Sequence, residues 1–255
     1  MALFDTHAHY DDSQFDPDRE ELLAALPENG VGLVVNPGCD IPTSRQALAL
    51  AERYPHVYAA VGLHPEDCAG AGEAELEAIR RLCGHEKAVA IGEIGLDYYW
   101  AENPPRPFQQ EIFRRQLALA QELDMPVIVH DREAHGDSLA IVKEFPGVRG
   151  VFHCYSGSAE MAQELIKLGW YLGFDGPITY KNARRAAEVA AVTPLERMVV
   201  ETDSPYLSPV PLRGKRNDSR NLTYVLETLA AWKGVTPEEM ARITLENGKR
   251  LYRLE

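Results

Sequence analysis

Two histidines one residue apart, His7 and His9, follow the first apolar segment of this 255-residue chain. In a β-strand, alternate side chains point to the same face, and residues two apart lie about 6.6 Å from each other along it. Two imidazoles placed in this way can converge on one metal ion, because imidazole nitrogen is a common metal ligand. The alternative is a polar loop that contains two histidines by chance.

Similar polar residues follow most of the other short apolar runs of the chain. They are His64 after the third run, Glu93 after the fourth, His130 after the fifth, His153 after the sixth, and Glu201 and Asp203 after the eighth. Imidazole together with carboxylate suits Zn, Mn or Fe, and carboxylate with water also suits Mg. A carboxylate that bridges two ions about 3.5–4 Å apart makes a two-metal hydrolytic site. Glu93, midway along the series, is the natural bridge.

The apolar runs themselves predict eight strands, most of them continuously apolar, as in a parallel sheet buried on both faces. The expected strands are Ala2–Thr6, Gly32–Asn36, Tyr58–Leu63, Ala88–Gly92, Pro126–Val129, Gly150–Phe152, Tyr171–Phe174 and Met198–Val200. Amphipathic segments lie between them, and eight β-then-α units in about 250 residues are typical of a TIM (β/α)8 barrel. We therefore expect a single α/β domain over residues 1–255. A doubly wound open sheet is the alternative, because periodicity does not reveal closure.

Helix boundaries are marked by local capping patterns. Thr43-x-x-Gln46 and Thr236-Pro237-Glu238-Glu239 both fit a capping box, which predicts that helices begin near these residues. Gly169 stands where a helix C-cap is expected.

The composition excludes some classes of protein. A net charge of −13 argues against a nucleic-acid coat protein held by counterion release, but not against an enzyme whose bound cations neutralise an acidic site. Four cysteines without a CxxC pair predict a reduced, cytoplasmic protein. Asp5 and Asp11-Asp12 interrupt the apolar region of any signal peptide. No apolar run approaches the roughly 20 residues of a membrane span, so we expect no membrane contact, and we expect a monomer.

The chain resembles the TatD family of metal-dependent deoxyribonucleases, within the amidohydrolase-like barrels. The resemblance runs from end to end and rests on six motifs in order. They are Phe4-Asp5-Thr6-His7-Ala8-His9, Val61-Gly62-Leu63-His64-Pro65, Gly92-Glu93-Ile94-Gly95-Leu96-Asp97-Tyr98, His130-Asp131-Arg132-Glu133-Ala134, His153-Cys154-Tyr155-Ser156-Gly157 and Glu201-Thr202-Asp203-Ser204-Pro205-Tyr206-Leu207.

The resemblance implies two divalent metal ions, Mg²⁺, Mn²⁺ or Zn²⁺, in one site. One ion is expected at His7, His9, Glu93 and Asp203, and the second at Glu93, His130 and His153. His64 matches a position near the substrate phosphate. The chain departs from the family pattern in the loop of residues 211–221. The family commonly has a segment like P-Y-R-G-K-R-N-E-P there, whereas this chain reads Pro211-Leu212-Arg213-Gly214-Lys215-Arg216-Asn217-Asp218-Ser219. The contacts of this loop are therefore the least certain part of the resemblance.

The activity implied is hydrolysis of phosphodiester bonds in DNA, at single-stranded or frayed ends, by a metal-activated water. We assign Asp203 as the general base, although a pure ligand role is the alternative. Arg132, Arg213, Lys215 and Arg216 are candidate phosphate-binding residues. The alternative for this basic segment is a solvated surface loop.

Other functions remain open at this point. A barrel hydrolase can act on a C–N or lactone bond, or remove the acyl group from aminoacyl-tRNA, and a non-catalytic barrel can serve as a binding protein. Tyr98, Tyr99 and Trp100 could stack the bases of a single strand. Aromatic residues after a strand more often pack the barrel rim, so we do not count them as site residues.

Overall fold

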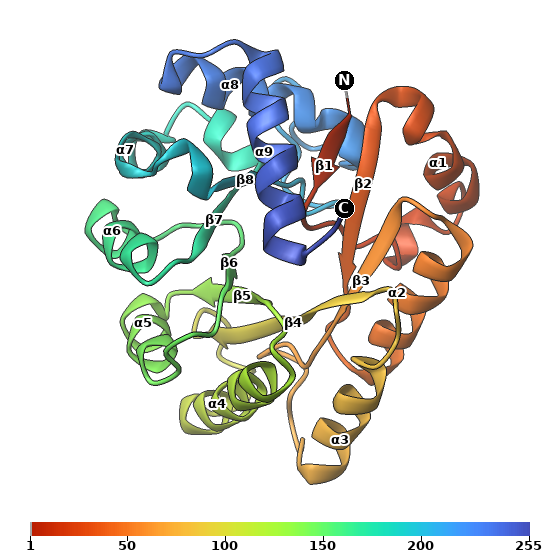
Figure 1. The fold of residues 1–255 in the computed structure, drawn as a ribbon, viewed down its shortest axis with the longest axis vertical. Helices are drawn as coiled ribbons and strands as arrows, with labels where there is room; N and C mark the ends of the chain where they lie inside the picture. Colours follow the sequence, from red (N-terminus) through yellow and green to blue (C-terminus); the bar gives the residue numbers. More distant parts are fainter. Residues whose placement is uncertain (1) are drawn as a thin grey trace.

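In the computed structural model, which describes residues 2–255, eight strands pair in sequence order within one parallel sheet. The strands are β1 (Leu3–Asp5), β2 (Val31–Pro37), β3 (Val57–Val61), β4 (Ala88–Asp97), β5 (Val127–Arg132), β6 (Gly150–Phe152), β7 (Tyr171–Phe174) and β8 (Met198–Val200). Every neighbouring pair from β1 to β8 is parallel. The sheet curls into a nearly closed barrel, which Figure 1 shows surrounded by helices.

The helices lie outside the sheet, as parallel strands require crossover connections. They are α1 (Arg19–Ala25), α2 (Ile41–Arg53), α3 (Glu73–Leu82), α4 (Arg106–Leu123), α5 (His135–Lys143), α6 (Ala159–Lys167), α7 (Arg184–Val192), α8 (Leu222–Lys233) and α9 (Pro237–Tyr252). Short 3₁₀ helices lie at Ser13–Phe15, Pro27–Asn29, Gly176–Thr179, Leu195–Arg197 and Ser219–Asn221. Within residues 2–255, no helix combines the length and the apolar character that a membrane crossing needs.

The barrel closes between the chain segments that continue β1 and β8. The amide of Thr6 donates to the Val200 carbonyl at 3.2 Å, the amide of Asp203 to the His7 carbonyl at 3.0 Å, and the amide of His9 to the Ser204 carbonyl at 2.7 Å. These bonds lie just beyond the strand ends. Closure therefore brings the segment of His7 and His9 directly beside that of Asp203.

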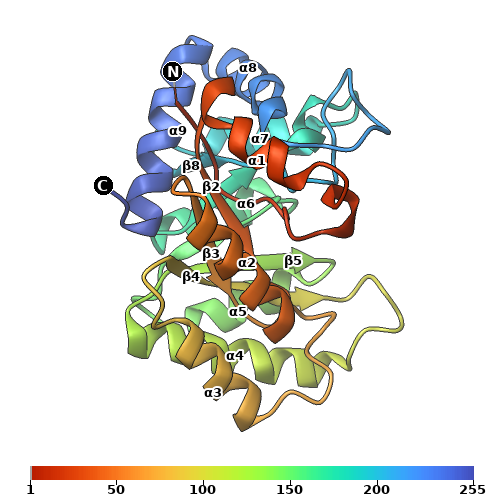
Figure 2. The ribbon, with the colours of Figure 1, turned by 90° about the vertical axis from the view of Figure 1, so that its right-hand side faces the viewer.

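Two apolar layers stabilise the barrel. One lies between strands and helices, and the other fills the barrel interior at the end where the strands begin. The interior layer consists of Phe4, Val35, Ala60, Val89, Ala90, Ile128, Val151, Tyr171, Val199, Leu251 and Tyr252. Its last two residues come from α9, and the Tyr252 hydroxyl donates to the Thr6 carbonyl at 3.1 Å. In Figure 2, α9 lies at one end of the barrel, and the long loops that follow the strands project from the other. The apolar layer and α9 close one end of the barrel, so the polar residues that follow the strands lie at the opposite, open end.

The predicted barrel is confirmed, and the open-sheet alternative is wrong. The expected strands agree with the observed ones within a few residues, except that β4 continues to Asp97 and so contains Glu93. Thr236 caps α9 as predicted, accepting a hydrogen bond from the Glu239 amide. The cap of α2 is Asp40, not Thr43, because the Asp40 carboxylate accepts from the Thr43 amide at 2.8 Å. Thr43 is the third helical residue of that capping box, and its hydroxyl oxygen accepts a hydrogen bond from the Asp40 amide.

The seal between α9 and the barrel depends on the absence of a side chain at Gly248. A Cβ atom there would lie 2.5 Å from the Phe4 ring. Phe4 is buried on all sides, so its ring has no space into which it can move.

This packing predicts a loss of stability when a side chain is added. We expect Gly248→Val to lower the free energy of unfolding by about 1–3 kcal/mol, measured by urea denaturation. Glu246→Val, exposed on the same helix, introduces the same side chain without the clash and should lose about 0.5 kcal/mol or less through helix propensity. Equal losses in both variants would contradict this packing.

Candidate metal centre and active site

Strand periodicity directs His130 and His153 into the barrel. Ile128 and Val151 belong to the interior apolar layer, and each histidine lies two residues further along its strand direction. Because side chains two residues apart share a face, both imidazoles point inward above the apolar layer. His130 Nδ1 and His153 Nε2 are 3.3 Å apart.

A β-bulge in β4 turns Glu93 and Asp97 inward. Ile91 pairs with Val127, but Ile94 pairs with Val129, so β4 has one residue more than β5 over this stretch. Ala90 faces the interior layer, whereas Ile94 and Leu96 face the helices. Without the extra residue, the alternation from Ala90 would send Glu93 and Asp97 to the helix side. Bulges next to active sites commonly redirect side chains in this way.

The β1 and β8 segments supply the remaining members of the cluster. His7 and His9 bring their Nε2 atoms within 3.0 Å of each other, so the predicted convergence of the two imidazoles is present. Asp203 has φ of 53°, a left-handed conformation that a non-glycine residue adopts at a cost of about 1–3 kcal/mol. Asp203 follows Val199 of the interior apolar layer by four residues, and its Oδ1 lies 3.6 Å from both histidine Nε2 atoms.

Asp5 connects the segments that hold His7 and Asp203. Its carboxylate accepts hydrogen bonds from the Thr202 amide at 3.0 Å, the Thr202 hydroxyl at 2.6 Å and the Ser219 hydroxyl at 2.6 Å. Asp5 is fully buried, and burial raises its pKa to about 6. A buried carboxylate with these partners locks β1 to the segment after β8.

Glu93 divides the surrounding donor atoms into two sets. Its Oε2 lies 3.4 Å from His7 Nε2 and 3.6 Å from His9 Nε2, on the side of Asp203. Its Oε1 lies 2.9 Å from His130 Nδ1 and 2.7 Å from His153 Nε2. One carboxylate thus faces a pair of imidazoles with each oxygen, which is the arrangement expected of a ligand shared between two ions.

The donor atoms have the chemistry and spacing that metal ions require. Two ligand atoms bound at about 2.1 Å to one ion lie about 3 to 3.4 Å from each other, close to the separations around Glu93. The Nδ1 atoms of His7 and His153 are buried without a hydrogen-bond partner. In a neutral imidazole the proton can reside on Nδ1, which leaves the Nε2 lone pair aimed into the cluster. Three overlapping groups of these side chains have ligand atoms close enough to hold an ion: His7, His9 and Glu93; His64, Glu93 and His130; and His7, His153 and Asp203. Their donor chemistry fits the two predicted ions, which would share Glu93.

Asp97 orients His130, a role that the sequence reasoning missed. Its Oδ2 lies 3.1 Å from His130 Nε2, so the Nε2–H donates to Asp97 and Nδ1 is turned toward Glu93. A carboxylate behind a ligating imidazole fixes the tautomer and raises the basicity of the ligand nitrogen. The sequence did contain one indication of this role. Asp97 follows Glu93 by four residues in the same motif, and residues four apart in a strand lie on the same face.

His64 belongs to the cluster by distance, with Nε2 at 3.5 Å from Glu93 Oε1. The amide of Glu66 donates to His64 Nδ1 at 3.3 Å, which leaves the proton of a neutral imidazole on Nε2. A protonated Nε2 is a hydrogen-bond donor and not a metal ligand. The geometry thus agrees with a substrate-side role for His64.

The electrostatics of the cluster favour a bound cation. Burial alone would raise the pKa of Glu93, but His153, His64 and His7 hold that pKa well below its ordinary value. Burial holds the pKa of His7 well below its ordinary value, so this imidazole is neutral. Burial opposes charge on His130 too, but the hydrogen bonds to Asp97 and Glu93 raise its pKa to about 10. Glu93 is therefore an anion, and a metal ion would displace the proton of His130 on binding.

The cluster lies at the floor of a cavity of about 1560 Å³. The residues that line it include Trp100, Arg132, Tyr180, Arg184 and Arg185. The sequence reasoning selected Arg132 but missed the two arginines at the start of α7, because charged residues at the beginning of a helix usually face solvent.

The other predicted phosphate-binding residues do not line this cavity. Arg216 forms an ion pair with Asp18 at 2.6 Å and covers the Phe15 ring, Arg213 stacks on the Tyr180 ring at 4.2 Å, and Lys215 is exposed. The divergent loop also braces the barrel seam, since Asn217 donates to the carbonyls of Thr202 at 2.9 Å and Tyr206 at 2.8 Å. These contacts support a structural role for the loop of residues 211–221, from which the sequence predicted phosphate-binding residues.

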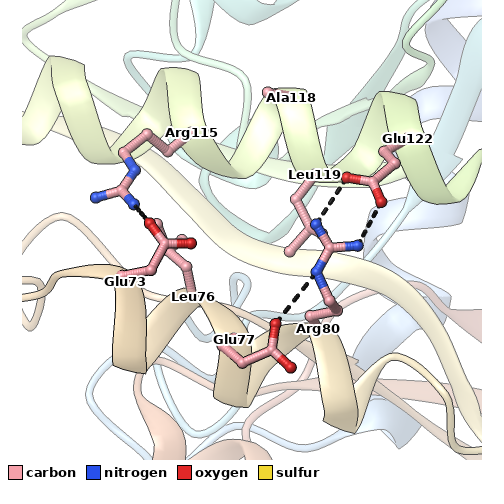
Figure 3. A pocket seen from close by; sticks show the side chains of 8 residues that line it. All are labelled: Glu73, Leu76, Glu77, Arg80, Arg115, Ala118, Leu119 and Glu122. Carbon is pink, nitrogen blue, oxygen red and sulfur yellow. Dashed lines mark hydrogen bonds and ion pairs between the residues drawn. The ribbon is translucent and has the colours of Figure 1, made fainter.

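A smaller hollow of about 270 Å³ lies on the outside of the barrel, between α3 and α4. Figure 3 shows that its charges are paired across the two helices. Arg80 contacts Glu122 at 2.5 Å and Glu77 at 3.5 Å, and Arg115 pairs with Glu73. The paired charges stabilise the helix contact and leave no group available for chemistry.

Comparison with known proteins identifies the family. The family model described as TatD related DNase matches residues 4–253. The chain belongs to the TatD family. YabD of Bacillus subtilis (strain 168), a metal-dependent hydrolase by name, is 46% identical over 254 residues, covering 99% of both chains. The protein named 3'-5' ssDNA/RNA exonuclease TatD from Salmonella typhimurium is 34% identical, covering 98% of both.

A solved structure agrees with this assignment. The crystal structure of YJJV, a TatD homologue from Escherichia coli K12, superposes with a TM-score of 0.92 at 33% identity, covering 99% of this chain and 98% of that one. The resemblance deduced from the six sequence motifs is confirmed. These comparisons show that the chain is a metal-dependent hydrolase of the TatD family.

The orienting role of Asp97 predicts a defect in metal binding. We expect Asp97→Asn to weaken Mn²⁺ affinity by about 10- to 100-fold, because an amide does not hold the His130 Nε2–H as a carboxylate does. Isothermal titration calorimetry on metal-stripped protein measures this. Asn103→Ala is the matched control: Asn103 donates to Asp97 Oδ1 at 3.1 Å, so its loss alters the loop but leaves the His130 contact. An equal loss of affinity in both variants would assign the effect to the loop.

Proposed function

We propose that this TatD-family protein hydrolyses phosphodiester bonds at the ends of single-stranded nucleic acid, with two divalent cations and an attacking water. The observation that carries the proposal is the position of Glu93, whose two oxygens face separate sets of imidazoles. The cations, when bound, would lower the pKa of the water and neutralise the charge that develops on the phosphoryl oxygens.

Asp203 is the candidate general base. Its Oδ1 faces His7 and His9, and its side chain remains 16% exposed to the cavity. The carboxylate thus has an open side from which it would accept the proton of the attacking water. His64, on the opposite side of Glu93, would donate its Nε2–H to a phosphoryl oxygen. Both side chains are held by buried surroundings, so little reorganisation is needed at the moment of reaction.

The size and composition of the cavity favour a polymer end over a compact substrate. Pockets for small molecules usually have about 300–1,000 Å³, and this cavity of about 1560 Å³ is larger. Arg132 and Arg185 also line it, and they would contact phosphates next to the scissile one. The name of the Salmonella relative, a 3'-5' exonuclease for single-stranded DNA and RNA, agrees with this substrate class.

Hydrolysis of another bond is the main competing function. A lactone, an amide or an aminoacyl-tRNA ester would be attacked by the same activated water. The discriminating experiment incubates the purified protein, with Mg²⁺ or Mn²⁺, with single-stranded DNA and RNA labelled at either end, with aminoacyl-tRNA and with panels of amides and lactones. We expect stepwise release of nucleotides from one end of the single strands. Turnover of a panel substrate with intact nucleic acid would refute the proposal.

Glu93→Gln tests the bridging carboxylate directly. The variant keeps the shape of the side chain but removes the anion that both sets of imidazoles face. We expect kcat on single-stranded DNA to fall by about 10³-fold or more, with an unchanged far-ultraviolet circular dichroism spectrum. Glu122→Gln, which breaks an ion pair outside the barrel, should retain activity. Substantial turnover by Glu93→Gln would rule out the bridge.

A further inference from the structure

An aromatic cluster at the mouth of the cavity remains solvent-exposed. Tyr99 is 53% and Trp100 44% exposed, whereas Tyr98 is partly buried, with its hydroxyl bonded to Asp137 at 2.8 Å. The expectation that these aromatics pack the barrel rim is therefore wrong for two of the three. Large exposed aromatic side chains beside a cavity commonly mark a binding surface.

Arg132 contacts the rings of both exposed aromatic residues. Its guanidinium carbon lies 4.0 Å from the centroid of the Tyr99 ring and 5.4 Å from that of Trp100. The two rings are nearly perpendicular, at 87°, with centroids 4.7 Å apart. The cation holds both rings through its attraction to their π faces. Trp100 and Arg132 also line the cavity that contains the metal cluster.

The loop that carries the aromatics is fixed to the metal centre through Asp97. The amide of Tyr99 donates to Asp97 Oδ1 at 2.9 Å, and Asn103 donates to the same oxygen. Gln109, from the first turn of α4, bonds both the amide and the carbonyl of Asp97, each at 2.9 Å. Asp97 therefore sets the position of the aromatic cluster and of His130 at once. A ligand held by the cluster has a defined distance to the metal centre.

Charge alone gives the cavity little attraction for a nucleic acid. Its acidic lining residues are Asp11, Asp12, Glu66, Asp67, Glu93, Asp131, Asp175, Glu188 and Asp203, and its basic ones are Arg132, Arg184 and Arg185. Arg184 is moreover paired with Glu188 at 3.0 Å. Cations on the floor would compensate only the charges near them. Affinity for the rest of the strand must come from contacts other than counterion release.

We infer that Trp100, supported by Arg132 and Tyr99, is a stacking platform for an unpaired nucleobase adjacent to the scissile phosphate. The inference rests on the proposed function and specifies how the substrate is selected. Every base offers a π face, so the platform accepts any sequence. A base inside a duplex already stacks on both neighbours and has no free face, so the platform selects unpaired nucleotides.

Steady-state kinetics of Trp100→Ala test the platform. On a single-stranded oligonucleotide with Mn²⁺, we expect KM to rise by about tenfold while kcat changes less than about threefold, because stacking contributes to binding and not to the chemistry. On an oligonucleotide of the same length with abasic sites at its end, the wild type and the variant should have the same KM. Trp100→Phe, which keeps an aromatic face, should recover most of the loss.

Leu168→Ala is the matched control for the kinetics. Leu168 is 45% exposed, nearly as much as Trp100, but it follows α6 and does not line the cavity. We expect this variant to bind both oligonucleotides as the wild type does. A KM increase in Leu168→Ala equal to that of Trp100→Ala would assign the effect to general surface changes and overturn the platform.

Tryptophan fluorescence gives a second readout that needs no turnover. Trp170 is buried in the hydrophobic core, and Trp232 packs against that core. Trp100 lines the cavity, so it is the tryptophan that a bound base can reach. Adding single-stranded oligonucleotide and Mg²⁺ to the Asp203→Asn variant, chosen to slow cleavage, should quench the fluorescence. The quenching should disappear when Trp100→Phe is added to that background and persist with Trp232→Phe.

The outcomes separate the platform from the proposed function. Cleavage of single strands with a KM rise confined to base-containing substrate supports both. Cleavage with an unchanged KM in Trp100→Ala, or quenching that survives Trp100→Phe, overturns the platform and leaves the function intact. Absence of cleavage of any nucleic acid by the wild type overturns the function and the platform together.

Discussion

A single buried carboxylate determines the organisation of the active end of this barrel. Glu93 is 3% exposed and remains ionised, and a buried anion is tolerated only where opposite charge or strong hydrogen-bond donors compensate the loss of hydration. Neutral imidazoles such as His7 give partial compensation. Two cations, one for each oxygen, would complete it. The same requirement explains why imidazoles from four separate strand ends surround one side chain.

Glycine residues leave space for the polar side chains at the open end of the barrel. Gly173 shows the principle, since a Cβ atom there would lie 2.4 Å from the Glu201 carboxylate. The apolar layer with α9 closes the opposite end, so water and substrate approach from the loop end only. The seam between β1 and β8 is locked by Asp5 and braced by the divergent loop. Stability and site geometry therefore depend on the same contacts.

Asp97 connects the parts of the site that perform different tasks. One oxygen orients His130, and the other anchors the loop that carries Tyr99 and Trp100. The proposed metal site and the proposed substrate platform would thus both depend on one residue of β4. In the proposed reaction, bound cations would neutralise the scissile phosphate, and the exposed aromatic surface would add affinity that a mostly acidic cavity cannot supply through charge.

The sequence by itself determined the barrel and most of the cluster. Eight apolar runs predicted the strands, and a period of two places His130 and His153 on the inner face. Local patterns did not reveal the bulge that turns Glu93 and Asp97 inward, because a bulge is defined by the register with the neighbouring strand. Tertiary structure likewise decided that Arg216 pairs with Asp18 while Arg185 reaches the cavity, and that Trp100 stays exposed. These outcomes depend on contacts between segments far apart in the chain, which no local pattern encodes.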